Sequence, residues 1–198
     1  PAPFFTYERS SRDTKSFGQA AECFDRLIKN AEDKKPWLGW VRLPSDKDQV
    51  KQVKTWLKKV KKNQTTLCVL GIGGSCLGAK AIYDWVKPKK SVLFLDNVDG
   101  FAFETALAGL DLKKTHFLAI SKSGETAETL FQLAHVFDLL KTKKLKFKDH
   151  VSVVTEDKLS TLKKVAVEFA LPSMSMPEDV GGRFSVFSTV GLAPLAWA

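Results

Sequence analysis

The sequence is poor in the residues that build disulfide frameworks and metal sites. Its 198 residues include three cysteines (Cys23, Cys68 and Cys76) and three histidines. No two cysteines form a CxxC pair, so neither a disulfide framework nor a zinc site is indicated. Free cysteines are typical of a reducing compartment, and we expect a cytoplasmic protein without a bound metal.

Long hydrophobic runs are also missing. No apolar stretch approaches the roughly 20 residues that a transmembrane helix needs. Residues 1–8 lack the basic and apolar pattern of a signal peptide. The hydrophobic content of 44% and charged content of 27% are those of an ordinary globular protein. We therefore expect no membrane association.

Basic residues are in excess, with a formal net charge of +9 and lysines concentrated in 51–62 and 141–148. Nucleic-acid binding is one interpretation of such clusters. However, neither cluster interleaves aromatic residues with arginines, and no nucleic-acid-binding signature is present. We interpret the lysines as the solvent faces of helices and a basic linker, which would also attract anionic substrates. No nucleic-acid partner is expected.

The first third of the chain has helical periodicity and no catalytic pattern. One apolar stripe runs from Phe17 to Ile28, and a second occupies one helical face from Val50 to Val60. Between them lies a loop that carries Trp37 and Trp40. The pattern predicts an N-terminal helical segment over residues 1–64.

Beyond residue 65 short apolar runs alternate with helical patterns. Near-continuous apolar strands of this kind indicate a parallel sheet covered on both faces. We predict an α/β three-layer sandwich, flavodoxin-like or Rossmann-like, with a mainly parallel sheet of about five strands over residues 65–198. Ligands of such sheets bind beyond the carboxyl ends of the strands. The predicted strands are 67–71, 91–95, 115–120 and 151–154, with helices at 76–86, 101–109, 127–140 and 158–168.

The first motif at this sheet edge is Gly71-Ile-Gly-Gly-Ser-Cys-Leu-Gly78. A buried strand, a glycine-rich turn and a helix start can together bind an anion. The motif half matches the dinucleotide fingerprint, because Cys76 stands at the third glycine position and Asp96 follows about 20 residues later. A nicotinamide site and a simple tight turn both stay open. Cys76 is either a reactive thiol at a helix start or a small packing residue.

The second motif is Ser121-Lys-Ser-Gly-Glu-Thr-Ala-Glu-Thr129. Its hydroxyls and backbone N–H groups can hold a phosphate. Glu125 and Glu128 are expected to be ordinary residues of the first helical turn. A serine-rich helix start without a ligand is the alternative. Two such loops at one sheet edge are uncommon, and the pair favours phosphate binding.

The third motif is Gly181-Gly-Arg183-Phe-Ser185. An arginine on a Gly-Gly turn suits the binding of an oxyanion or a developing enediolate, although a surface turn with a solvated arginine has the same sequence. None of the three histidines falls in a glycine-rich or strand-end loop, so no catalytic histidine is predicted.

These three motifs, in this order, resemble the N-terminal half of the bacterial glucose-6-phosphate isomerase family. The likeness runs from about residue 40 to the end and includes Asp179-Val-Gly-Gly-Arg-Phe-Ser185 and Thr189-Val-Gly-Leu-Ala-Pro-Leu195. It implies a sugar-isomerase (SIS) fold, which aminosugar-phosphate enzymes and phosphosugar-sensing regulators share.

The resemblance also implies roles for individual residues. One group would hold the sugar phosphate, a second would contact the sugar chain, and an arginine would stabilise the enediolate between aldose and ketose. Glu128 would support the phosphate loop from behind. Cys76 stands where members often carry a larger or acidic residue, and Glu125 where a threonine is usual, so one hydroxyl of the family's phosphate site is missing here. The residues that would hold the phosphate are Ser121, Lys122 (through its backbone), Ser123 and Thr126. Gly74 and Ser75 would contact the sugar chain, and Arg183 would be the arginine at the enediolate.

In the family the general base, a glutamate, and the ring-opening histidine and catalytic lysine belong to later motifs. We therefore expect residues 65–198 to be the first of two sugar-isomerase domains of a longer homodimeric enzyme, inactive alone. Its ligands would be glucose 6-phosphate and fructose 6-phosphate, without metal or nucleotide cofactor. A non-catalytic phosphosugar sensor and a nicotinamide-dependent dehydrogenase remain as alternatives.

Overall fold

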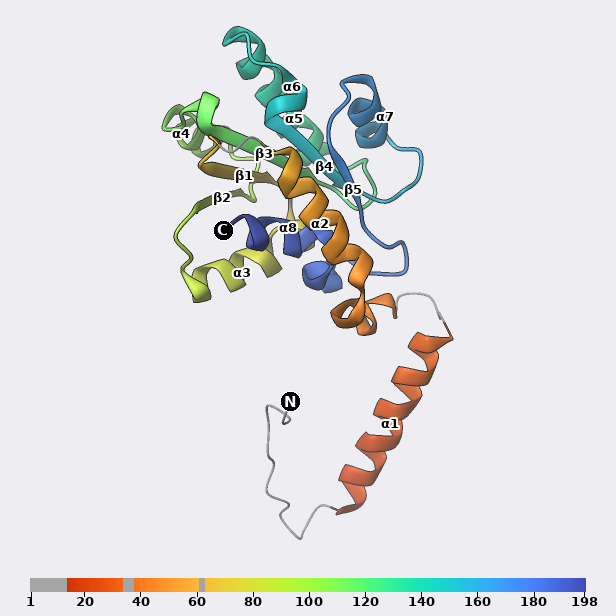
Figure 1. The fold of residues 1–198 in the computed structure, drawn as a ribbon. Coiled ribbons are helices and arrows are strands. Elements are labelled where there is room, and N and C mark those ends of the chain that lie inside the picture. The colour runs from red at the N-terminus through yellow and green to blue at the C-terminus, as the bar shows by residue number, and fades with distance from the viewer. Residues whose placement is uncertain (1–13, 34–37, 61–62) are drawn as a thin grey trace.

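A computed structural model describes residues 14–33, 38–60 and 63–198 (Figure 1). Trp37, Lys61 and Lys62, which belong to the predicted loop and the first lysine cluster, lie outside the described residues. The lysines of both clusters that are described are exposed, as the solvent-face interpretation predicts.

The chain forms five strands among the described residues, each preceded or followed by helices. The α-helices are α1 (Thr14–Glu32), α2 (Lys47–Lys59), α3 (Leu77–Val86), α4 (Gly100–Ala108), α5 (Ala127–Thr142), α6 (Phe147–His150), α7 (Thr161–Glu168) and α8 (Thr189–Trp197). The strands are β1 (Thr66–Leu70), β2 (Ser91–Leu95), β3 (Thr115–Ile120), β4 (Val151–Thr155) and β5 (Ser173–Ser175). Short 3-10 turns are η1 (Gly39–Val41), η2 (Leu43–Ser45), η3 (Gly73–Ser75), η4 (Leu112–Lys114) and η5 (Gly182–Phe187).

The strands form one sheet in the order β2-β1-β3-β4-β5, and every neighbouring pair is parallel. Helices cover both faces, with α4, α5 and α7 on one side and α2, α3 and α8 on the other (Figure 1). This confirms the predicted α/β sandwich with a five-stranded parallel sheet. The division of the chain between residues 64 and 65 stays a prediction.

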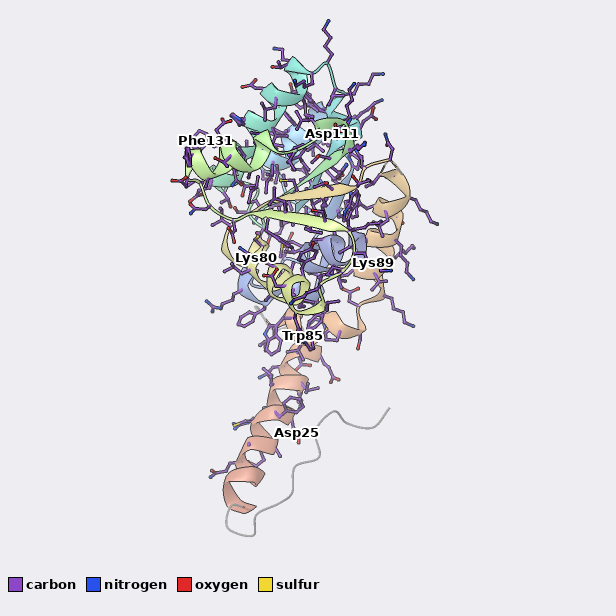
Figure 2. All side chains as sticks on the ribbon, turned by 90° about the vertical axis from the view of Figure 1, so that its left-hand side faces the viewer. Asp25, Lys80, Trp85, Lys89, Asp111 and Phe131 are labelled. Carbon is purple, nitrogen blue, oxygen red and sulfur yellow. The ribbon has the colours of Figure 1, made fainter. Side chains whose placement is uncertain are left out.

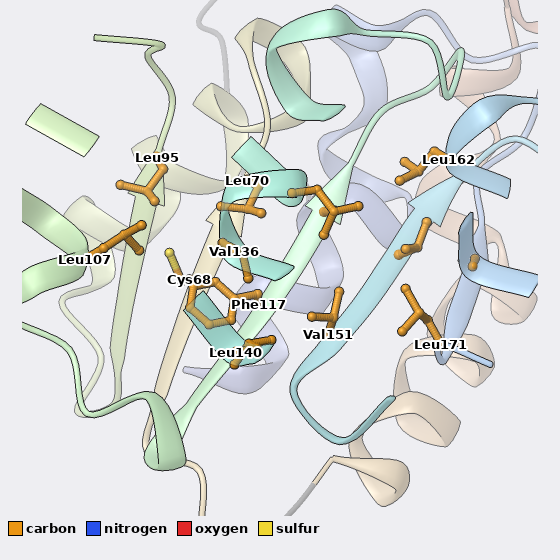
Figure 3. Close-up of a cluster of buried hydrophobic side chains, with 14 of the residues drawn as sticks. Cys68, Leu70, Leu95, Leu107, Phe117, Val136, Leu140, Val151, Leu162 and Leu171 are labelled. Atoms are coloured by element: carbon orange, nitrogen blue, oxygen red, sulfur yellow. The ribbon is translucent and has the colours of Figure 1, made fainter. Parts of the chain in front are cut away.

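Alternating side chains of the central strands form two separate cores. Cys68 and Leu70 of β1 and Phe117 of β3 face α4, α5 and α7 (Figure 3). Leu67 and Leu118 face α2, α3 and α8. All five side chains are fully buried. Strands that bury both faces read as continuous apolar runs, which is why these strands are visible in the sequence.

Two helical predictions are wrong in detail. Part of the segment predicted as a basic linker, 141–148, is helical, because α5 continues to Thr142 and α6 begins at Phe147. Stacked rings of Phe137 and Phe147, 4.2 Å apart, hold α6 against α5. The seventh helix begins at Thr161 rather than at residue 158, because the Ser160 side chain caps it by accepting from the Lys163 N–H.

Helix α1 extends away from the rest of the described chain, and most of its described side chains are exposed (Figures 1 and 2). The exposed fraction of Phe24, in the predicted apolar stripe, is 60%. None of the helices in the described ranges is both long and apolar enough to cross a membrane.

Candidate functional site

The site lies where the direction of the sheet winding reverses. Strand β1 has β2 on one side and β3 on the other, so the chain leaves β1 and β3 toward opposite faces. The loops that follow these two strands therefore lie side by side at the carboxyl edge, where open α/β sheets bind ligands. Both loops are the glycine- and serine-rich motifs found in the sequence.

The first wall is the loop from Ser121 to Thr126, called here the phosphate loop. Ser121 is buried, and its Oγ lies 2.8 Å from the Thr126 Oγ1 and accepts from the Gly124 N–H at 3.1 Å. Thr126 precedes α5, and its side chain makes no capping hydrogen bond to that helix. The first-turn N–H groups of α5 thus keep donor capacity for an anion at the positive end of the helix.

Gly124 allows the tight turn of the phosphate loop. Its φ is 69°, in the left-handed region that glycine adopts without strain. A Cβ at this position would collide with the Ser160 side chain.

The next residue, Glu125, differs from the prediction. Its carboxylate serves α7 by accepting from the Thr161 N–H and hydroxyl at 2.6 and 2.7 Å, rather than the first turn of its own helix. These bonds lower the pKa of Glu125.

The second wall is formed by η3 and the loop Gly181–Arg183, called here the Arg183 loop. A Cβ on Gly74 would lie 2.8 Å from the Arg183 nitrogen and closer still to the Gly182 carbonyl. The buried Ser185 joins the two backbones, because its Oγ donates to the Gly182 carbonyl at 2.7 Å and lies 3.3 Å from the Gly74 carbonyl oxygen. Glycine at position 74 is thus required for this close approach.

The Arg183 loop is also held from outside by the segment before α2. Trp40 stacks on Phe184, with ring centroids 5.4 Å apart. Arg42 forms an ion pair with Asp179. The Gly39 N–H donates to the Asp179 carbonyl at 3.0 Å. The tryptophan loop of the sequence therefore braces the strand-end loop that carries the arginine.

The third wall is the turn after β4. Glu156 has a side chain only 3% exposed, and its two oxygens contact different lysines. Oε1 lies 3.2 Å from Lys122 Nζ, and Oε2 forms an ion pair with Lys158. A buried carboxylate is costly unless it is paired in this way. Sequence reasoning placed the 155–158 turn at this edge but missed both Glu156 and Lys158.

These walls line an open cavity of about 320 Å³. Three cationic side chains line it against one carboxylate, so the cavity favours an anion. Other hollows are larger, and the two of greatest volume among them, about 860 and 820 Å³, lie between α4 and α5 and along α2. Neither of these two is lined by the loops that follow β1, β3 and β4. The lining residues of the 320 Å³ cavity are Ile72, Gly74, Ser75, Lys122, Ser123, Thr126, Glu156, Lys158, Gly182 and Arg183.

The cavity is lined by six of the eight predicted site residues, and Ser121 and Glu128 do not line it. Ser121 is buried beneath the phosphate loop and contacts it through Thr126. Glu128 is in the first turn of α5, as predicted, and is not a lining residue. Cys76 is buried, and desolvation raises its pKa to about 12, with Asp96 adding to the rise and Lys80 opposing it. It is therefore a packing residue with a protonated thiol.

Asp96, the candidate ribose ligand of a dinucleotide, forms an ion pair with Lys80 of α3 at 2.8 Å. Figure 2 labels Lys80 on α3. The three histidines lie outside the cavity wall. His116, for example, is buried at the start of β3, at the opposite edge of the sheet. Within residues 14–33, 38–60 and 63–198, no cluster of three or more His, Cys, Asp and Glu side chains is placed to hold a metal ion.

The strand order and the helices on both faces define a class of fold, the doubly wound α/β sandwich. The tagatose-6-phosphate ketose/aldose isomerase of Escherichia coli has this fold, with a TM-score of 0.53 over 97% of this chain and 50% of that one. At 12% identity the likeness concerns the fold alone.

Sequence comparison then identifies the family: the chain belongs to the phosphoglucose isomerase family, whose profile matches residues 44–197. It is 36% identical to the glucose-6-phosphate isomerase of Thermus thermophilus over 87% of this chain and 42% of that protein. A crystal structure of a glucose-6-phosphate isomerase from Chlamydia trachomatis aligns with a TM-score of 0.70 and 29% identity, over 77% of this chain and 30% of that one. The chain thus spans less than half the length of these relatives.

Proposed function

We propose that this chain is the phosphosugar-binding part of an aldose–ketose isomerase that interconverts glucose 6-phosphate and fructose 6-phosphate through a cis-enediol. Family membership supports the reaction class, and the relatives named above are glucose-6-phosphate isomerases. The whole enzyme would be a homodimer that serves glycolysis and gluconeogenesis. The free cysteines of this chain suit the reducing environment of the cytoplasm.

The observation that carries the proposal is one cavity with hydroxyls at one side and an arginine at the other. Ser123, Thr126 and the phosphate-loop backbone, with Lys122 contributing its N–H, would hold the phosphate at the positive end of α5. Gly74 and Ser75 would orient the sugar chain. The Arg183 guanidinium, charged at any pH, would stabilise the negative charge that develops on the enediolate oxygens.

Moving a proton between C1 and C2 requires a base within hydrogen-bond reach of the substrate. The carboxylate in the cavity wall, Glu156, has both oxygens in contact with lysines, so accepting a substrate proton would break an ion pair. We propose that the base comes from another part of the enzyme and that the isolated chain binds phosphosugar without turnover. No metal or nucleotide cofactor is needed for this chemistry.

A phosphosugar sensor would use the same phosphate loop but would not need a guanidinium beside the sugar carbons. Arg183 in the cavity wall therefore favours the isomerase. The dehydrogenase alternative requires Asp96 for a ribose, and this carboxylate is engaged by Lys80.

Calorimetric titration with fructose 6-phosphate tests the phosphate site. In the double variant Ser123→Ala/Thr126→Ala two hydrogen bonds to a charged group are lost, at about 1.5–3 kcal/mol each, so the affinity should fall by at least about a hundredfold. The matched control is Ser91→Ala/Thr142→Ala, which removes two exposed hydroxyls outside the cavity. Unchanged affinity in the Ser123/Thr126 variant would refute the assignment of the phosphate loop.

A further inference from the structure

The Lys122 side chain joins three loops that are distant in sequence. Its ammonium group donates to the Val180 carbonyl at 2.8 Å and the Glu178 carbonyl at 3.0 Å. It also lies 3.2 Å from Glu156 Oε1. The phosphate loop, the turn after β4 and the segment after β5 therefore meet at one nitrogen atom.

Backbone contacts make this junction stiffer. The Glu156 N–H and the Thr155 hydroxyl both donate to the Lys122 carbonyl, at 3.2 and 3.3 Å. The Lys122 side chain is 21% exposed and that of Glu156 3%. Separating the charges would leave a buried carboxylate with one partner fewer, which is strongly unfavourable.

The two carbonyls bound by Lys122 come directly before the Arg183 loop. Val180 is buried and is followed at once by Gly181, whose carbonyl accepts from the Phe184 N–H at 2.9 Å. A displacement of Val180 would be transmitted to Arg183 through only two intervening glycines. The ammonium group thus fixes the position of the start of the Arg183 loop relative to the phosphate loop.

We propose that Lys122 is a positioning residue whose side chain, together with Glu156, sets the separation between the phosphate loop and the Arg183 loop. The inference rests on the proposed function, in which these two loops hold opposite ends of one sugar phosphate. A ligand of fixed length gains from both ends only when their spacing is fixed beforehand, and an error of about 1 Å can cost as much as a hundredfold in rate.

The variant Lys122→Met removes the ammonium group and keeps an unbranched side chain. Calorimetry should show the affinity for fructose 6-phosphate falling about tenfold, since that ligand needs both loops in register. The affinity for inorganic phosphate, which needs the phosphate loop alone, should fall by a clearly smaller factor, because that ligand loses only one of the three lining cations. Glu156→Gln should shift the ratio of the two affinities in the same direction.

Fluorine NMR of protein labelled with 5-fluorotryptophan reports on the Arg183 loop directly, because Trp40 stacks on Phe184. The Trp40 signal is assigned with Trp40→Phe. It should move in Lys122→Met and in Glu156→Gln, while the signals of the core residues Trp56 and Trp197 stay in place. If Lys122→Met does not fold, Glu156→Gln provides both measurements.

The matched control is Lys163→Met, which removes a lysine from an ion pair with Asp157 at 2.7 Å outside the cavity. It should change neither the affinity for either ligand nor the Trp40 signal. Equal losses of affinity for fructose 6-phosphate and inorganic phosphate in Lys122→Met would overturn the positioning role, because they would mean that the ammonium group acts on the phosphate itself. An unmoved Trp40 signal with an unchanged affinity ratio would also overturn it. A parent chain that binds neither ligand refutes the proposed function instead, and an unmoved Trp40 signal then still refutes the junction.

Discussion

Replacing Gly74 by alanine places a methyl group between η3 and the Arg183 loop. The new Cβ would lie 2.8 Å from the Arg183 nitrogen, where ordinary contact begins at 3.4 Å, and the Gly182 carbonyl is nearer still. Both obstacles are backbone atoms, so no side chain can rotate away. The two loops must move apart, and Ser185 would lose its place between the Gly74 and Gly182 carbonyls.

The size of the effect follows from the geometry. Overpacking of this kind costs typically 1–3 kcal/mol. For a chain of this length a loss of about 2 kcal/mol lowers the melting temperature by roughly 4–8 °C. Because the displacement of about 1 Å falls between the loops that would hold the sugar, the affinity for fructose 6-phosphate should drop about tenfold or more.

Scanning calorimetry and ligand titration of Gly74→Ala measure both quantities. Gly100→Ala is the matched control, since a Cβ at Gly100 meets nothing within 4 Å. It should keep the affinity of the parent chain, and its melting temperature should not fall. A Gly74→Ala protein with unchanged melting temperature and affinity would show that η3 and the Arg183 loop do not touch.

Two further predictions concern groups away from the cavity. Burial, followed by the nearby His150, lowers the pKa of His116 to about 3, against the opposing effect of a backbone hydrogen bond involving Asp149. As the pH falls from about 6.5 to 3, His116 therefore binds a proton in the unfolded chain and stays neutral in the folded chain. The free energy of unfolding decreases over this range by up to about 5 kcal/mol. Urea unfolding should show this loss, with a smaller pH slope in His116→Asn; equal slopes would contradict it. For the cysteines, a thiol reagent at pH 8 should label the exposed Cys23 rapidly and the buried Cys68 and Cys76 only after unfolding. Rapid labelling of a second thiol, located by peptide mapping, would contradict the burial of that cysteine.

The sheet was predictable because its strands are buried on both faces. Runs such as those of β1 and β3 contain few polar residues, and their spacing by helices fixes a parallel arrangement. Strand β5 is harder to see, since it has only three residues and two of them are serines. Helix α6 depends on the contact of Phe147 with Phe137, a packing event that helical periodicity over four residues cannot reveal.

The site was predictable as a set of loops and not as a set of contacts. Glycines and hydroxyls after β1 and β3 identify the loops, because strand ends of a parallel sheet share an edge. The pairing of Lys122 with Glu156 and the stacking of Trp40 on Phe184 join residues far apart in the chain. Glu125 illustrates the same limit, since its position suggests its own helix while its carboxylate binds Thr161 of another.

An NMR titration of this chain with fructose 6-phosphate, resolved at each backbone amide, tests most directly whether the cavity beyond β1 and β3 binds a phosphosugar. The largest shifts should fall in Gly73–Ser75, in Ser121–Thr126 and at Gly182. Shifts confined to the 860 Å³ hollow between α4 and α5, or none at millimolar ligand, would contradict the proposed binding site.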